Sequence, residues 1–146
     1  MLSIVIVSYN TADLTSNCIK SIYNQTKEID YEIIVVDNNS QDDSVSRIQR
    51  EFPNIKVIVN KENRGFAYAL NVGIKNSCGE IILSINSDTL IVDNAIEKSY
   101  NFLKDNLQYG ILGIKLLNED NSIQPSCRHL PDIWNCFSEA FFLVNI

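Results

Sequence analysis

The sequence predicts an α/β fold: a mainly parallel open sheet with helices on both faces. Short apolar runs rich in β-branched residues alternate along the chain with longer segments in which apolar residues recur every three or four positions. The short runs are continuously apolar, as in strands that are buried on both faces. The chain has 146 residues, 45% of them apolar, which suffices for one domain with a sizeable core. We therefore expect a single domain over residues 1–146.

Leu2–Ser8 is the first expected strand, with the sequence LSIVIVS. Asn10 or Thr11 follows as the expected N-cap of a helix, because both side chains can accept a hydrogen bond from the first turn. The expected inner positions of this helix lie four residues apart, with two apolar neighbours beside them: Leu14, Cys18, Ile22, Ile19 and Tyr23.

Tyr31–Asp37 is the second expected strand, and a polar loop separates it from a second helix. Pro53 is expected to end that helix, because the residue before a proline disfavours helical backbone. Residues 55–59 form the third expected strand. The apolar positions at helical spacing in the second helix are Val45, Ile48 and Phe52.

A loop over residues 60–65 precedes the third expected helix. Small Ala67 and Ala69 lie where this helix can approach the sheet closely, and Gly79 is expected to stop it. Residues 80–86 form the fourth expected strand. The expected inner side of the third helix carries Phe66, Leu70 and Ile74.

Asp93 is the expected N-cap of a fourth helix, and residues 110–117 are expected to form a fifth strand. A turn at residues 118–121 should lead residues 122–124 back toward that strand. The inner stripe of the fourth helix is Ile96, Tyr100, Leu103 and Leu107. The last segment is expected to form a helix that buries aromatic and aliphatic side chains and drives self-association: Trp134, Phe137, Phe141, Phe142 and Leu143.

The charge and the cysteines narrow the class of protein. Lys and Arg total 12 and Asp and Glu total 18, and the net charge of −6 argues against nucleic acid as a partner. An anionic ligand would have to be attracted by local cations. The four cysteines form no C-x-x-C pair, and we interpret them as reduced thiols at core positions of a cytoplasmic protein: Cys18, Cys78, Cys127 and Cys136.

Several common motifs are absent from the sequence. The residues after Met1 do not resemble a signal peptide, and no apolar run approaches the roughly 20 residues that span a bilayer. The spacing of Cys127, His129 and Cys136 lacks the second ligand pair of a zinc site, so we interpret these as packing or surface residues. The absence of G-x-G-x-x-G and P-loop motifs argues against dinucleotide oxidoreductases and P-loop NTPases.

Polar residues stand directly after four of the expected strands. Parallel strands place their C-terminal ends at one edge, and open α/β sheets bind ligands at that edge. Each set alone would suit an ordinary turn or helix cap, but four sets at one edge favour a ligand site. The four sets are Ser8-Tyr9-Asn10, Asp37-Asn38, residues 60–64 and Asn86-Ser87-Asp88.

The residue types in these sets suit a nucleotide that is held partly through a divalent cation. Asp37 can accept a hydrogen bond from a pyrimidine N–H group or a ribose hydroxyl. Asp88 is a hard oxygen ligand, of the kind that binds Mg²⁺ or Mn²⁺ together with substrate phosphates, and Asn86 can orient that group or bond a ligand hydroxyl. Arg64 can meet a base or a phosphate, and the alternative is an exposed ion pair with Glu62.

Four segments occur in an order that resembles the nucleotide-sugar-binding half of family 2 glycosyltransferases, which have the GT-A fold. They are SIVIVSYN, VVDNNSQDDS, NKENRGFAYALNVGI and ILSINSDTL. A further segment, LGIKLLNEDNSIQPSCRHLP, is similar to the rhamnosyltransferase-like branch of that family. The resemblance covers residues 3–131.

The resemblance implies roles for the residues at the sheet edge. Asp37 would contact the nucleoside, and Asp88 would be the metal ligand at the last position of an Asp-x-Asp motif that here begins with Asn86. The residues implied to line the base and ribose pocket are Ser8, Tyr9 and Asn10. Those implied to flank the base and the diphosphate are Asn63, Arg64 and Gly65, and Ser87 completes the set between Asn86 and Asp88.

The implied reaction is the transfer of a sugar, with inversion, from a UDP- or dTDP-sugar to an acceptor hydroxyl. Mg²⁺ or Mn²⁺ would neutralise the leaving diphosphate, and a general base would deprotonate a glycan or lipid-linked acceptor. The family's base lies in the acceptor-binding part, so we expect it beyond Ile146. A non-catalytic nucleotide-sugar-binding module, or a fragment without activity, is the alternative. The implied location is the cytoplasm, at the membrane face through the acceptor, and the implied pathway is cell-surface polysaccharide synthesis.

Overall fold

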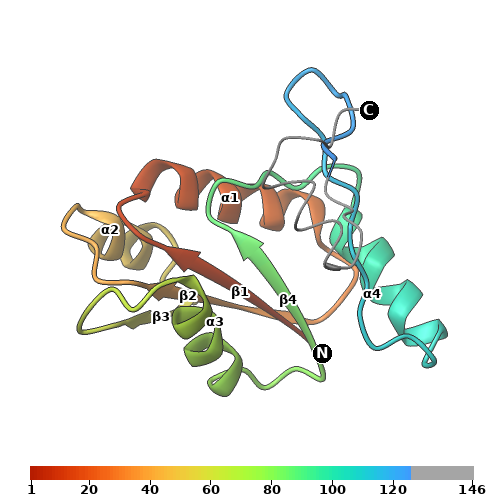
Figure 1. Ribbon diagram of the computed structural model, residues 1–146, viewed down its shortest axis with the longest axis horizontal. Helices are drawn as coiled ribbons and strands as arrows, with labels where there is room; N and C mark the ends of the chain where they lie inside the picture. The colour runs from red at the N-terminus through yellow and green to blue at the C-terminus, as the bar shows by residue number, and fades with distance from the viewer. Residues whose placement is uncertain (126–146) are drawn as a thin grey trace, which may run out of the picture. The chain divides into compact units, whose positions relative to one another are not determined.

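A computed structural model describes residues 1–125, which fall into two compact units (Figure 1). The first unit is Met1–Leu112 and the second is Gly113–Ile146, of which the part up to residue 125 is described. The expectations for residues 126–146, including the aromatic helix, its self-association, Cys127, His129 and Cys136, lie outside the described residues.

The first unit is built on a four-stranded parallel sheet with the strand order β3-β2-β1-β4. Ser8 pairs with Asp37 and Val7 pairs with Asn86, so the strands end level with one another. Because all three pairings are parallel, the C-terminal ends of the strands lie at one edge of the sheet. The strands are β1 (Leu2–Ser8), β2 (Tyr31–Asp37), β3 (Lys56–Val59) and β4 (Ile81–Asn86).

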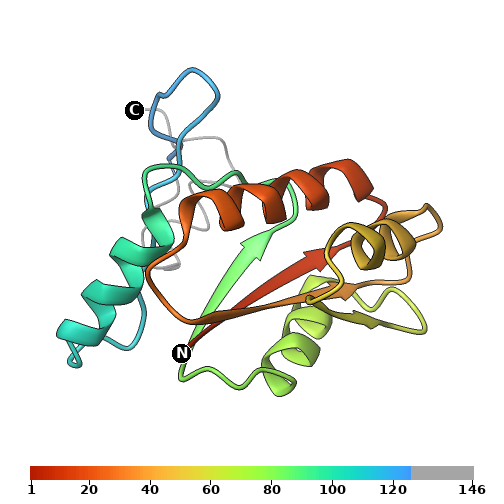
Figure 2. The same cartoon turned by 180° about the vertical axis from the view of Figure 1, so that it is seen from behind.

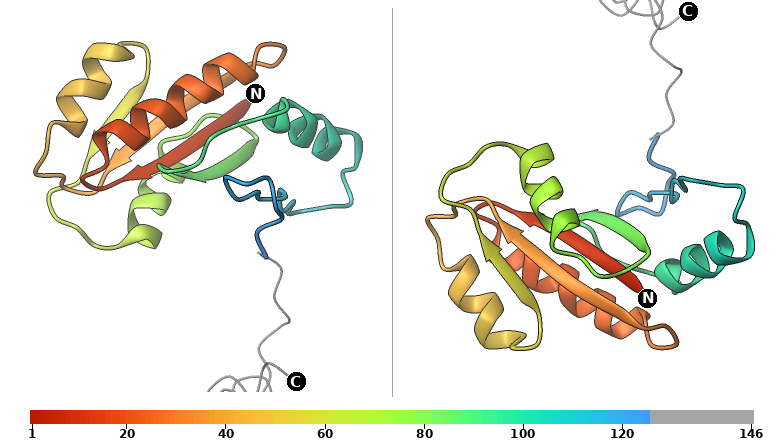
Figure 3. Two further views of the ribbon diagram at one scale, coloured as in Figure 1. Left: turned by 90° about the horizontal axis from the view of Figure 1, so that it is seen from above. Right: turned by 90° about the horizontal axis from the view of Figure 1, so that it is seen from below.

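Helices cover both faces of this sheet, as the sequence predicts. One face carries α1 and α2, and α3 lies on the opposite face, as the view from behind and the views from above and below show (Figures 2 and 3). Each helix except the last lies between two parallel strands in sequence, which is the crossover arrangement of α/β proteins. The helices are α1 (Ala12–Gln25), α2 (Ser44–Glu51), α3 (Phe66–Lys75) and α4 (Ala95–Asp105).

The central strand β1 is buried on both faces. Ile4 and Ile6 contribute to the core under α1 and α2, whereas Val5 between them packs toward α3 with Val36. All four of these side chains are fully buried. Successive strand residues point to opposite faces of the sheet, so a strand that is covered on both sides exposes neither set of side chains to solvent. This explains the continuous apolar run at residues 4–7 of the strand.

Helix α3 turns a different side to the sheet from the one expected. Phe66 and Ile74 are 48% and 39% exposed, whereas Ala69 and Gly73 are buried. A Cβ atom on Gly73 would lie 2.3 Å from Cγ1 of Val5, so the helix approaches the strands too closely for a larger residue. The apolar spacing was therefore a wrong guide at Phe66 and Ile74, whereas Leu70 is partly buried against the core as expected. The expected close approach is confirmed at Ala69 but is wrong for Ala67, which is exposed.

Gly79 also has a different role from the expected helix stop. Helix α3 ends at Lys75 with Asn76 as its C-cap. A Cβ atom on Gly79 would lie 2.6 Å from the backbone nitrogen of Ser3, so the glycine allows the chain to pass close to β1 before β4 begins.

Helix α1 buries most of the expected apolar stripe together with two polar residues. Cys18, Ile19 and Ile22 are fully buried as expected, whereas Leu14 and Tyr23 are 47% and 41% exposed. Thr15 and Ser16 are also fully buried. The buried hydroxyls have partners: Thr15 Oγ1 donates to the carbonyl oxygen of Thr11 at 2.8 Å, and Ser16 Oγ donates to Glu51 Oε2 at 2.7 Å. A buried hydroxyl is tolerated when it is hydrogen-bonded, which apolar periodicity does not reveal.

The region around α4 departs from expectation at both ends. Asn94, in a left-handed conformation, is the N-cap in place of Asp93, and Leu107 lies beyond the helix and is 88% exposed. Ile96 is buried in the core, as expected.

Cys78 was expected in the core but is exposed, whereas Cys18 is buried.

The expected strand at residues 110–117 is not formed. The described part of the chain shows a single antiparallel bridge there, between Leu117 and Ile123. The expected turn between them is present, because Asn121 N donates to the carbonyl oxygen of Asn118 at 2.9 Å. An apolar run becomes a strand only when a partner supplies a ladder, and within residues 1–125 no strand pairs with residues 110–115. No helix in the described part is long and apolar enough to span a membrane.

Candidate functional site

Backbone hydrogen bonds hold the chain segments together just beyond the strand ends. Asn38 N donates to the carbonyl oxygen of Ser8 at 2.8 Å, and Asn60 N donates to that of Asp37 at 2.9 Å. These bonds extend the pairing of β1, β2 and β3 by one residue. The loops that leave the three strands therefore start side by side.

Asp37 organises the loop that follows β2. Its side chain is almost fully buried, and Oδ2 accepts from the backbone N–H of Ser40 at 2.8 Å while Oδ1 accepts from the Ser40 hydroxyl at 2.5 Å. The Ser40 hydroxyl also accepts from Asn10 N at 2.8 Å, and Asn10 Oδ1 accepts from Gln41 N at 2.8 Å. The structure thus brings Asn10 and Asp37 together through Ser40. A carboxylate has about four acceptor sites, so these bonds leave acceptor capacity on Asp37.

A cluster of three hydroxyls links the end of β1 to the turn after β4. Oγ of Ser8 lies 3.1 Å from Thr11 Oγ1 and 3.0 Å from Thr15 Oγ1, and Thr11 donates to Ser87 Oγ at 3.2 Å. The Thr15 proton is already used on the carbonyl oxygen of Thr11. Because each hydroxyl has one proton, the Ser87 hydroxyl accepts from Thr11 and keeps its own proton for another partner.

The turn after β4 presents Asp88 to solvent. Thr89 N donates to the carbonyl oxygen of Asn86 at 3.2 Å, and Asn86 and Asp88 are both exposed. The Sγ atom of Cys18 donates to the same carbonyl oxygen at 3.8 Å. Burial, and secondarily the Asp88 carboxylate, raises the pKa of Cys18 to about 12. Cys18 therefore stays a neutral thiol.

The donor set fits a divalent cation that is shared with a ligand. Within residues 1–125 no group of three or more His, Cys, Asp or Glu side chains could enclose a metal ion. Asp88 offers one exposed carboxylate, with the amide oxygen of Asn86 and the hydroxyl of Ser87 beside it in sequence. Mg²⁺ and Mn²⁺ are commonly held by one or two carboxylates, and substrate phosphates complete the coordination.

The loop between β3 and α3 supplies amides and a cation. Asn38 Nδ2 donates to Asn63 Oδ1 at 2.7 Å, which ties this loop to the one after β2. Arg64 pairs with Glu62, with 3.7 Å between Nε and Oε1, so the ion pair weighed from the sequence is present. Its guanidinium also lies 4.3 Å from the centre of the Tyr68 ring. The Arg64 side chain is 55% exposed and remains accessible to an anion.

Two contributors to this edge were not expected from the sequence to act there. Ser40 joins Asp37 to Asn10, and Thr11 joins β1 to the turn at Ser87. Asn60, which was expected at this edge, donates to Asn38. Thr11 was expected only as a helix cap, yet its side chain makes no cap hydrogen bond. The signal available in the sequence was the density of hydroxyl and amide residues after the strands.

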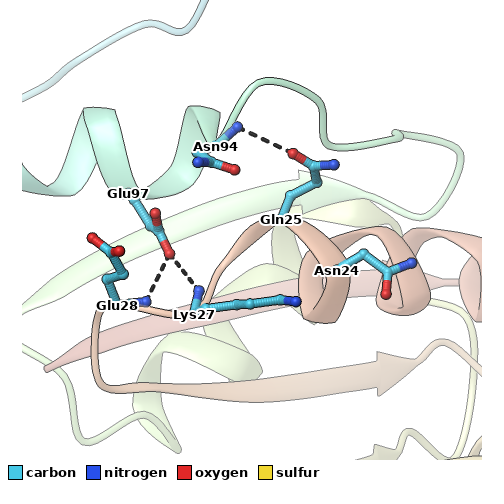
Figure 4. Close-up of a pocket in the computed structure, with 6 residues that line it drawn as sticks. All are labelled: Asn24, Gln25, Lys27, Glu28, Asn94 and Glu97. Atoms are coloured by element: carbon cyan, nitrogen blue, oxygen red, sulfur yellow. Dashed lines mark hydrogen bonds between the residues drawn. The ribbon is translucent and has the colours of Figure 1, made fainter.

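A small polar pocket lies elsewhere in the first unit, where α1 ends and α4 begins, and has a volume of about 190 Å³ (Figure 4). Glu97 Oε1 accepts from the backbone N–H groups of Lys27 and Glu28, and these bonds lower its pKa. Asn94 N donates to Gln25 Oε1 at 3.3 Å. These groups satisfy one another, so we interpret the pocket as the junction that fastens α4 to the loop entering β2.

Comparison with protein families identifies one match over most of the chain. The model of "Glycosyl transferase family 2" matches residues 3–132. A poly(ribitol-phosphate) beta-glucosyltransferase of Bacillus spizizenii is 43% identical over 111 residues, which are 72% of this chain and 17% of that protein. An uncharacterized glycosyltransferase of Haemophilus influenzae is 30% identical over 99% of this chain and 48% of its own length. The chain thus spans less than half of both relatives.

Solved structures give the same picture of the fold. The mannosyltransferase PcManGT of Pyrobaculum calidifontis, in complex with GDP-Man and Mn²⁺, is 28% identical with a TM-score of 0.64. The match covers 72% of this chain and 32% of that one. TarS 1-349 of S. aureus in complex with UDP-GlcNAc is 22% identical with a TM-score of 0.64, and the match covers 73% of this chain and 32% of the other. The second likeness supports the fold alone.

Proposed function

This chain belongs to glycosyl transferase family 2 and has the parallel sheet and covering helices of the GT-A fold, and we propose that its strand-end edge binds the nucleotide of a nucleotide-sugar donor. One observation carries the proposal. The polar residues after β1, β2 and β4 are joined by side-chain hydrogen bonds through Ser40 and Thr11. Open parallel sheets bind ligands at this edge. The mannosyltransferase that is 28% identical is described in complex with GDP-Man and Mn²⁺, which supports a sugar nucleotide as the ligand.

The edge offers different groups to the base and to the phosphates. Tyr9, which is 46% exposed, offers an aromatic face and a hydroxyl to the base or ribose, next to Asn10 and the remaining acceptor capacity of Asp37. Ser8 is fully buried, so it would support the site indirectly, through its hydroxyl contacts with Thr11 and Thr15. On the other side of Asp37, Asn63, Arg64 and Gly65 would flank the base and the diphosphate.

Arg64 would provide local attraction for the phosphates. The chain carries a net charge of −6, so the long-range field opposes an anionic ligand and a nearby cation must compensate. Arg64 is paired with Glu62 only at the surface, where ion pairs are worth about 0–1 kcal/mol. Exchanging this partner for a diphosphate would therefore cost little.

Asp88 would hold a divalent cation, with Asn86 and Ser87 beside it. Mg²⁺ or Mn²⁺ bound there would stabilise the negative charge that develops on the leaving diphosphate. Asn86 stands where a second carboxylate would strengthen the site, so metal affinity should depend on the ligand's own phosphate oxygens. The protein's part is to keep the turn in place through the bond from Thr11 to Ser87.

We further propose that the whole protein transfers a sugar, with inversion, from a UDP- or dTDP-sugar to a hydroxyl of a glycan or lipid-linked acceptor. Residues 1–146 would be the donor-binding part, and the general base would lie beyond Ile146. The name of the Bacillus relative, which specifies poly(ribitol-phosphate), favours a polymer as the acceptor. We propose cell-surface polysaccharide synthesis as the pathway. We also propose the cytoplasm, at the membrane face, as the location. The similarity of residues 112–131 to the rhamnosyltransferase-like branch remains the reason to test dTDP-rhamnose first among the donors.

Calorimetry with UDP, dTDP and GDP tests the donor site. We expect binding to be at least about tenfold tighter with Mn²⁺ or Mg²⁺ than with a chelator present, since a cation held by Asp88 would offset the negative charge of the phosphates. Asp88→Ala should abolish this metal dependence. Asp93→Asn removes one negative charge from an exposed residue of the same loop and serves as the control. Equal nucleotide affinity with and without metal in the unmodified protein would contradict the role of Asp88.

A further inference from the structure

Three asparagines and one backbone amide form a chain of hydrogen bonds beside the proposed donor site. Asn60 Nδ2 donates to Asn38 Oδ1 at 3.1 Å, and Asn38 Nδ2 donates to Asn63 Oδ1 at 2.7 Å. The backbone N–H of Gly65 donates to the same oxygen of Asn63 at 3.0 Å. Asn63 Oδ1 thus accepts two hydrogen bonds, one from Asn38 and one from Gly65.

The backbone N–H of Gly65 determines the direction of the whole chain. A backbone N–H can only donate, so the Asn63 atom that faces it must be the oxygen. Asn38 must then meet that oxygen with its nitrogen, which leaves its own oxygen to accept from Asn60. The orientation of all three amides, which are otherwise nearly symmetric in shape, follows from this one donor.

The conformation of Gly65 and the burial of two asparagines keep this arrangement in place. Gly65 has φ 83° and ψ 169°, a region that is essentially restricted to glycine. No atom lies within 4 Å of a Cβ built on it, so the backbone angles, and not lack of space, require the glycine. Asn38 and Asn60 are 3% and 9% exposed, and a buried amide that lost its partner would be costly.

We propose that Asn38 is a positioning residue that turns the NH₂ group of Asn63 toward the ligand, and that the ligand group bound there is a hydrogen-bond acceptor oxygen. Asn63 is exposed, and its Nδ2 makes no hydrogen bond within residues 1–125. The acceptor is a carbonyl oxygen of the base or an oxygen of the diphosphate. This inference rests on the proposed donor site, and it adds the polarity of one contact and the residue that sets it.

A double-mutant cycle on Asn38 and Asn63 tests the inference, with UDP, dTDP and GDP titrated in the presence of Mn²⁺. Each single substitution to alanine should weaken binding of the preferred nucleotide by about tenfold, the value of one hydrogen bond to a charged or well-aligned partner. Adding Asn38→Ala to Asn63→Ala should then cause no further loss, because Asn38 acts through Asn63. A merely structural Asn38 would weaken binding equally in both backgrounds, which would overturn the proposal.

A second variant keeps the test valid if Asn38→Ala unfolds. Asn63→Asp retains an inward oxygen for Gly65 and Asn38, but replaces the outward NH₂ donor with a carboxylate oxygen, and should weaken binding by more than about tenfold at unchanged thermal stability. Asn39→Asp places the same charge on the neighbouring loop, at a residue whose φ of 69° aspartate tolerates. Equal affinity of these two variants at high salt would overturn the inference.

The neutral nucleoside separates the two sources of the acceptor. If Asn63→Asp weakens binding of the nucleoside as well as of its diphosphate, the acceptor oxygen is on the base. If it weakens binding of the diphosphate alone, the acceptor is a phosphate oxygen. Failure of the unmodified protein to bind any of the three nucleotides would overturn the proposed function together with this inference. Binding that is unaffected by Asn63→Asp would overturn this inference alone.

Discussion

The hydroxyl of Thr11 donates a hydrogen bond to the hydroxyl of Ser87 at 3.2 Å, although the two residues are 76 positions apart in the chain. Thr11 belongs to the loop that leaves β1, and Ser87 stands next to Asp88 in the turn that leaves β4. The proposed nucleoside pocket and the proposed metal turn are therefore coupled by one side-chain contact. Removing this hydrogen bond should lower the free energy of unfolding only slightly, but it should change the geometry of the site.

Thr11→Val should weaken metal-dependent nucleotide binding several-fold. The substitution keeps the shape of the side chain and removes the hydroxyl that bonds Ser87 and contacts Ser8. We expect the free energy of unfolding to fall by only about 0.5–1.5 kcal/mol, the usual net value of a hydrogen bond. Thr11→Ser retains the hydroxyl and should bind as the unmodified protein does. Calorimetry with a nucleoside diphosphate and Mn²⁺ measures the effect, and wild-type affinity of Thr11→Val would show that the link is not needed.

Glu51 should make the stability of the fold dependent on pH in the acid range. Hydrogen bonds from Ser16, Arg47 and Lys20 lower the pKa of Glu51 from 4.5 to about 2 and fasten α2 to α1. Because the folded state binds the proton less readily than the unfolded chain, this contribution is complete above about pH 5 and is lost as pH falls toward 2. Glu51→Gln should therefore be less stable than the unmodified protein near neutral pH.

Urea unfolding at a series of pH values checks this expectation. The difference in free energy of unfolding between Glu51→Gln and the unmodified protein should shrink steadily as pH falls through this window. Glu80→Gln, at an exposed residue just before β4, is the matched control. A difference that stays constant down to pH 2 would mean that lost packing, and not the charge of Glu51, explains the effect.

Gly73→Ala should destabilise the protein by about 1–3 kcal/mol, the typical cost of overpacking a core. The added methyl group would meet Cγ1 of Val5 at 2.3 Å and Cγ2 of Val36 at 3.2 Å, so α3 would have to move away from the sheet. At Gly110 a Cβ atom meets nothing within 4 Å, which makes Gly110→Ala the matched control. Thermal and denaturant unfolding measure both variants. Equal stability of the two would show that α3 can shift at no cost.

Much of the fold could be predicted from the sequence because its signals are local. The continuous apolar runs of β1 and β2 report burial on both faces, and the polar residues after them report the edge where parallel strands end. The alternation of strands and helices then allows few topologies other than a parallel sheet with crossovers. The positions of Ser8, Asp37 and Asp88 near one edge follow from the same reasoning.

Other features depend on partners that are distant in the chain. Residues 110–117 have a strand-like sequence, but a strand needs a paired neighbour, and the sequence does not say whether one is present. Helix α3 places Ala69 and Gly73 nearest the sheet instead of Phe66 and Ile74 because the distance to Val5, set by the packed sheet, leaves no room for larger residues there.

The sequence by itself determined which kinds of groups gather at the site: carboxylates, amides, hydroxyls and one arginine, each placed by the strand that precedes it. The tertiary structure alone decided how these groups are paired and oriented. Thr11 reaches Ser87, and Gly65 sets the direction of three amides, through hydrogen bonds whose geometry depends on loops that meet only after the sheet has formed. A hydrogen bond depends on distance and angle in space, which residue type and local spacing do not encode.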